Sequence, residues 1–147
     1  MNCLSVRAPW AHLIIFGDPD GDHKDIENRT RSTSHRGPLA IHVSRRVDWD
    51  AMRPLGLDHE TYTAFLGCII GVVDLYACNR RSTSRWAERD SVHWYLKRPR
   101  ALTKPIMHRG MVQIHPVSDD IVVPLIALRD EDAMLCKTME TAGRRLS

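Results

Sequence analysis

Three charged side chains in the segment Lys24–Arg29 have the types and the spacing needed to recognise a nucleotide base. The segment reads Lys-Asp-Ile-Glu-Asn-Arg, and on a β-strand successive side chains point to opposite faces. Glu27 and Arg29 would therefore share one face, while Ile26 points into the core. A carboxylate accepts hydrogen bonds from base amino groups, and a guanidinium holds a phosphate or a carbonyl group. Lys24 could serve as a general base towards water if burial lowers its pKa. The same three charges could instead form only a structural salt-bridge network.

A second candidate contact is the loop Asn79–Asp90, in which Trp86 lies among arginines that include Arg81 and Arg85. An exposed tryptophan stacks on a base, which contributes about 1–3 kcal/mol per base, and arginines bind phosphates. This pattern predicts a contact with single-stranded nucleic acid. The alternative is that Trp86 fills one end of the core. Basic residues also gather at other strand ends and loops, Arg36 among them, and they bind phosphates only if they share one rim.

The sequence gives no sign of a metal or a nucleotide cofactor. Asp18, Asp20 and Asp22 resemble the start of a calcium loop, but His23 stands where that loop needs glycine and Arg29 where it needs glutamate. The chain contains no His-Glu-x-x-His motif, no Cys-x-x-Cys pair and no glycine-rich phosphate loop. We therefore expect neither a metal nor a cofactor.

Length and composition predict a single domain spanning residues 1–147. The chain has 147 residues, 43% of them apolar, which is enough for a core. Its net charge is +3, and its 21 basic residues comprise 17 arginines and only 4 lysines, a balance that permits an anionic partner without requiring one. No apolar run approaches the roughly 18 residues of a membrane span, no secretory signal is visible, and the four cysteines are widely spaced. These features favour a cytoplasmic protein with reduced thiols and no membrane contact; the oligomeric state is left open.

The elements that would position these residues form an α+β pattern of five or six strands with peripheral helices. The expected strands are Leu4–Arg7, Ile26–Arg29, Leu39–Val43, Cys68–Ala77, Ser91–Leu96 and Gly110–His115. The expected helices are Pro9–Gly17, one or two within Asp48–Phe65, and a helical tail after Ser118 with a boundary at Pro124. The segment Lys97–Arg109, rich in proline and arginine, should separate the last two strands. The pattern predicts a small mixed β-barrel.

Five segments in order resemble the ASCH domains of the PUA-like superfamily. They cover residues 4 to about 116 and are Leu4–Ala11, Lys24–Thr30, Arg36–His42, Gly67–Leu75 and His93–Gly110. The second of them matches the Lys-x-x-Glu-x-Arg half of the family signature. The chain departs from the signature in one respect: six residues separate Gly17 from Lys24, where the family usually has one. Either Asp18–His23 is an inserted loop, or Gly21 takes the role of the glycine.

The resemblance implies a PUA-like curved barrel with a cleft, and a nucleic-acid-linked role in the cytoplasm. The expected partner is RNA, another single-stranded nucleic acid or a modified nucleoside. Lys24, Glu27 and Arg29 are the central site residues, with Arg36, Asp74 and Trp86 secondary.

An enzymatic alternative is a hydrolase of RNA or of a modified nucleoside, of ribonuclease or acetylcytidine amidohydrolase type. Lys24 would then be the base, with Glu27 or Asp74 assisting. The amidohydrolase branch carries a threonine at the position of Glu27, and a carboxylate does not replace a hydroxyl nucleophile in acyl transfer. A third alternative is a protein-interaction domain that docks through the helical extension 118–147.

Overall fold

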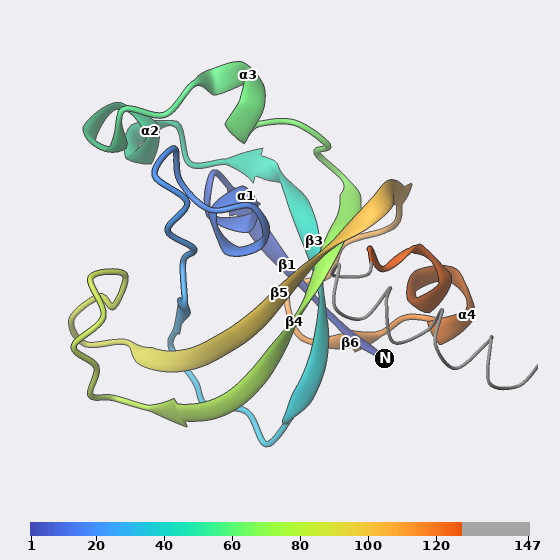
Figure 1. The fold of residues 1–147 in the computed structure, drawn as a ribbon. Helices are drawn as coiled ribbons and strands as arrows, with labels where there is room; N and C mark the ends of the chain where they lie inside the picture. The colour runs from blue at the N-terminus through green and yellow to red at the C-terminus, as the bar shows by residue number, and fades with distance from the viewer. Residues whose placement is uncertain (128–147) are drawn as a thin grey trace, which may run out of the picture.

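The computed structural model describes residues 1–127 and is built on one six-stranded mixed sheet (Figure 1). The strands are β1 (Asn2–Ala8), β2 (Ile26–Arg29), β3 (Gly37–Val47), β4 (Cys68–Asn79), β5 (Val92–Met107) and β6 (His115–Pro116). Their order in the sheet is β2-β5-β4-β3-β1-β6. β1 and β3 run parallel, and every other neighbouring pair is antiparallel.

The helices are short: α1 (Trp10–Ile15), α2 (Trp49–Leu55), α3 (His59–Tyr62), α4 (Asp119–Val122) and a 3₁₀ turn at Val123–Leu125. Figure 1 shows the sheet curving around α1, with α2 and α3 at one end and α4 on the opposite side. α1 contacts β1, β3, β4 and β5. In residues 1–127 no helix is long and apolar enough to cross a membrane.

The core is divided between the two faces of the sheet. On the inner face, Ala11, Ile14 and Ile15 of α1 pack against alternating apolar side chains of the central strands, such as Leu4 and Val6 of β1. On the outer face, Cys3 and Ala40 belong to a smaller cluster that α4 covers with Val122. The other side of α1 presents Leu13 to a third cluster, which includes Ile26, Met52, Tyr62 and Trp86.

The sheet is mixed and α+β as expected, but within residues 1–127 it is not closed into a barrel. β2 pairs only with β5, and β6 pairs with β1 over two residues. The prediction of a strand over Gly110–His115 was therefore wrong apart from its last residue. Residues 108–114 instead form a loop whose main chain contacts the side chains of Ser5 and His42.

The prediction that Lys97–Arg109 separates two strands was also wrong, because β5 continues through it to Met107. The prolines are tolerated for a physical reason. Pro99 and Pro105 both fall where the β4–β5 register shifts, between Val72 and Asp74 for the first proline and between Ile69 and Gly71 for the second. At such an irregularity a residue of the strand is left out of the ladder, so the missing proline N–H is not needed there.

The first residues of the predicted helical tail after Ser118 form α4 and the 3₁₀ turn, with Pro124 in the turn. The remainder of the predicted extension 118–147 lies outside the described residues beyond position 127.

Gly71 of β4 allows α1 to approach the sheet closely. A Cβ at this position would lie 2.6 Å from Ile15 Cδ1 and 2.7 Å from the main-chain oxygen of Arg100 on β5. We expect Gly71→Ala to lower the free energy of unfolding by about 1–3 kcal/mol, the usual cost of overpacking a core. Urea denaturation measures the change.

The matched control is Lys104→Ala, on an exposed position of the neighbouring strand β5, which should alter stability by less than about 0.5 kcal/mol. Equal stability of the Gly71→Ala variant and the wild type would contradict the packing argument.

Candidate functional site

A cleft of about 1130 Å³ opens between β1, β2, the end of β3 and residues 107–112. Its charged lining is predominantly basic. The basic side chains are Arg7, Lys24, Arg29, Arg45, Arg46 and Arg109, against the acidic Glu27, Asp48 and Glu88. Such a lining attracts anions, because low-dielectric walls focus the field of charges of one sign.

The three residues predicted from their spacing come together in this cleft. Lys24 Nζ lies 3.8 Å from Glu27 Oε1, and Arg29 Nη2 lies 3.9 Å from Glu27 Oε2. Both distances exceed the 2.7–3.2 Å typical of an N–H···O hydrogen bond. Glu27 Oε2 is buried and accepts no hydrogen bond, so this carboxylate oxygen has acceptor capacity that only the more distant Arg29 charge compensates.

β2 sets the direction of these side chains as predicted. Its antiparallel register on β5 places Glu27 opposite Trp94, and Ile26 points into the core, where it is 1% exposed. Lys24 precedes the strand, and its main-chain N–H donates to the carbonyl of Leu13 in α1. The position of the lysine is therefore fixed by helix and strand together.

Lys24 is buried although it carries a charge. Its ammonium donates to the main-chain oxygen of Ile26 and lies 5.7 Å from the centre of the Trp10 ring. Burial lowers the pKa of Lys24 below the ordinary lysine value, because desolvation disfavours the ammonium, and the Glu27 charge offsets part of this shift.

Arg29 connects β2 with β1, two strands that are not neighbours in the sheet. Its Nη2 donates to the main-chain oxygen of Ser5 at 3.0 Å. The guanidinium also lies 5.7 Å from the centre of the Trp94 ring. The Arg29 side chain therefore spans the open side of the sheet at the cleft. Lys24, Glu27 and Arg29 thus form a salt-bridge network and also line the cleft, so the two interpretations of the sequence apply to the same three residues.

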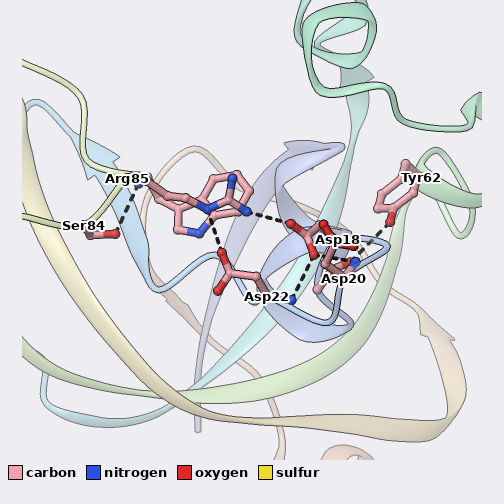
Figure 2. A network of polar contacts seen from close by, with 8 residues as sticks. Asp18, Asp20, Asp22, Tyr62, Ser84 and Arg85 are labelled. Carbon is pink, nitrogen blue, oxygen red and sulfur yellow. Dashed lines mark hydrogen bonds and ion pairs between the residues drawn. The ribbon is translucent and has the colours of Figure 1, made fainter.

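In the loop predicted to contact single strands, Arg85 and Trp86 lie outside the cleft. Arg85 forms ion pairs with Asp18 at 2.6 Å and Asp22 at 2.7 Å, as Figure 2 shows, and its guanidinium lies 4.0 Å from the centre of the Trp86 ring. Trp86 is 9% exposed and packs in the third core cluster with Leu13. Its position matches the alternative in which it fills the core.

The remaining predicted site residues also lie outside the cleft. Asp74 is held by Arg98 at 3.2 Å and Arg100 at 2.9 Å. Arg36 donates to main-chain oxygens of its own loop, and Arg81 is exposed in the loop after β4. None of the three lines the cleft, so Asp74 does not join Lys24 and Glu27 in one reaction centre.

Sequence reasoning missed Ser5 and His42, which lie in the cleft 2.9 Å apart from Oγ to Nδ1. Burial lowers the pKa of His42 below its ordinary value, partly offset by a hydrogen bond to the main chain of His108. A signal was present: Leu4-Ser5-Val6 and Ile41-His42-Val43 each place one polar side chain between two core residues. On a strand, that pattern turns the polar residue to the face opposite the core.

No family model matches the chain, and no curated protein matches it by sequence. Within the part of the chain that the structure describes, no three His, Cys, Asp or Glu side chains are grouped so that they could share a metal ion.

Replacing Glu27 by Gln tests the electrostatic coupling to Lys24. We expect Glu27→Gln to lower the free energy of unfolding at neutral pH by about 1–3 kcal/mol, the range for a buried charge that loses its partner. Burial lowers the pKa of Lys24, so between this lowered pKa and the ordinary lysine pKa the native state binds fewer protons than the unfolded chain. In that pH range the free energy of unfolding rises with pH. Without Glu27 this pKa falls further. The deficit should therefore shrink as the pH rises from 7 towards 10 in urea denaturation.

The double variant Lys24→Met/Glu27→Gln is the control, because it lacks the buried cation. Its stability difference from the wild type should not decrease in the same way with pH. A Glu27→Gln deficit that stays constant or grows over this range would show that Lys24 is not the coupled group.

Proposed function

We propose that the cleft binds a single-stranded nucleic-acid segment, or a modified nucleoside within one. The observation that carries the proposal is the unpartnered Oε2 of Glu27, buried in a cleft whose lining is basic. The Arg29 charge 3.9 Å away compensates part of the burial of this oxygen, and a ligand donor would supply the hydrogen bond that it lacks. The resemblance to ASCH domains, which rests on five segments in order and includes the Lys24-x-x-Glu27-x-Arg29 match, supports the same class of ligand.

Base recognition would use Glu27 as the acceptor. A base amino group that donates to Oε2 would gain a charge-assisted hydrogen bond, whereas uracil, which has no amino group, could not supply it. Trp10 is half-buried in the cleft wall, and its indole Nε1 donates to Asp48 Oδ2 at 3.1 Å. An aromatic ring held in this way is suited to stacking on a base.

Phosphate binding would use the rim arginines, defined here as Arg7, Arg45, Arg46 and Arg109. All four are exposed and line the cleft. Arginines on exposed loops and strand ends bind phosphate oxygens through paired N–H groups. The rim would hold the backbone while Glu27 selects the base, which is the usual division between positioning and specifying contacts.

Fluorescence anisotropy with labelled single-stranded RNA of about 10 nucleotides tests the proposal. We expect binding that weakens with salt. Arg46→Ala should weaken it further and reduce the slope of log affinity against log salt by about 0.7 for each phosphate that the variant no longer neutralises. Glu27→Gln should reduce the preference for cytosine-rich over uracil-rich probes by roughly tenfold, about 1.4 kcal/mol, without changing the salt slope.

Arg36→Ala is the matched control, because Arg36 is an exposed arginine outside the cleft and its loss should leave binding unchanged. Weak binding to every probe that is insensitive to salt would overturn the proposal. An effect of Arg36→Ala equal to that of Arg46→Ala would show that the cleft is not the binding site.

A further inference from the structure

A second pair of side chains lies in the same cleft, Ser5 on β1 and His42 on β3. The two positions are direct partners in the parallel register of these strands, so the side chains lie next to each other on the cleft face. Ser5 Oγ is 2.9 Å from His42 Nδ1. This is the distance at which a hydroxyl donates to an imidazole nitrogen.

A main-chain carbonyl determines which ring nitrogen of His42 carries the proton. His42 Nε2 lies 2.7 Å from the main-chain oxygen of His108, and a carbonyl can only accept. Nε2 is therefore the donor, and Nδ1 of the neutral ring is the basic nitrogen. The N–H of Met111 donates to Ser5 Oγ at 3.2 Å, so the hydroxyl directs its own proton to His42. This is the order nucleophile, base and orienting group that activates a hydroxyl.

Gly110 allows the orienting segment to lie against the pair. A Cβ at Gly110 would be 2.7 Å from His42 Cε1 and 2.8 Å from Ser5 Oγ. The carbonyl of His108 and the N–H of Met111 reach the pair from either side of this glycine. His42 is 2% exposed, and its burial lowers the pKa of the ring below the ordinary histidine value, because desolvation favours the neutral imidazole that can take a proton.

Arg29 supplies a positive charge beside the hydroxyl. Its Nη2 donates to the main-chain oxygen of Ser5 at 3.0 Å, which places the guanidinium next to the residue that carries Oγ. A cation close to the reacting serine favours the negative charge that develops when its hydroxyl attacks an acyl carbon. The rim arginines lie in the same cleft and would hold an anionic group of the substrate.

From this geometry we infer that Ser5 is a nucleophile with His42 as its general base, and that the cleft hydrolyses an anionic carboxylic ester. Ser5 Oγ attacks the acyl carbon while its proton passes to His42 Nδ1. The ester C–O bond breaks, and the leaving alcohol takes that proton. Water then attacks the acyl-serine with His42 as base, which releases the carboxylic acid and regenerates Ser5. The inference rests on the proposed function in one respect: the rim arginines that would bind phosphate are the groups that would hold the anionic part of the ester.

A fluorophosphonate probe tests the pair on the full-length chain without any nucleic acid. We expect a single covalent adduct, located on Ser5 by peptide mapping and absent in Ser5→Ala. Removing the base in His42→Gln should slow labelling by at least about 100-fold.

Ser44→Ala is the matched control, because Ser44 lies in the same cleft on β3 and its Oγ accepts only from the main-chain N–H of Arg46. It should label like the wild type. Umbelliferyl hemisuccinate, an anionic ester, then serves as the substrate probe, and its hydrolysis should disappear in Ser5→Ala.

Absence of an adduct, adducts on other serines, or labelling of His42→Gln at the wild-type rate would each overturn the inference. Circular dichroism checks that the variants fold. If the His42→Gln variant does not fold, nitrogen NMR of the wild-type His42 ring replaces it as the test. A neutral ring that carries its proton on Nδ1 would overturn the inference. RNA binding without an adduct would overturn the esterase inference and leave the proposed function standing. An adduct without RNA binding would overturn the proposed function and leave the esterase inference standing.

Discussion

The hydrogen bond from Arg29 to the main chain of Ser5 is the interaction on which the cleft depends. β2 and β1 lie on opposite sides of the central strands, and within residues 1–127 no backbone ladder joins them. Arg29 spans this distance, and Glu27, itself near Lys24, lies beside the guanidinium. A closed barrel would have filled the same space with backbone hydrogen bonds. Because side chains make the connection instead, the opening remains polar, basic and accessible to a ligand.

The buried charges of Lys24 and Glu27 lie close to each other, and α1 helps to hold the lysine in place. α1 fills the concave side of the sheet and also accepts the Lys24 main-chain N–H at Leu13. Gly71 brings the helix close to β4, and the same helix supplies Trp10 to the cleft wall. A shift of α1 would therefore change the core and the position of the lysine together. The packing of the core and the geometry of the cleft are therefore coupled through α1.

Sequence alone predicted the parts of the site that depend on local alternation. β2 was expected at Ile26–Arg29 and is found there, with Ile26 inward and Glu27 in the cleft. What could not be predicted depends on pairing between distant segments. The prolines concealed the length of β5, because their tolerance follows from register shifts against β4. The contact of Ser5 with His42 requires the parallel register of β1 and β3, which no local pattern encodes.

The loop between Gly17 and Lys24 closes on itself through hydrogen bonds of Asp18. Asp18 accepts from the main chain of Asp20 and Asp22 through its side chain, and its own N–H donates to the carbonyl of Asp22. The loop therefore returns almost to its starting point, as Figure 2 shows, and Arg85 holds it from outside. Because the two ends of the loop meet, its length does not affect the positions of α1 before it and β2 after it. Its tip could be shortened, extended or replaced by a peptide tag while the lysine after it keeps its place.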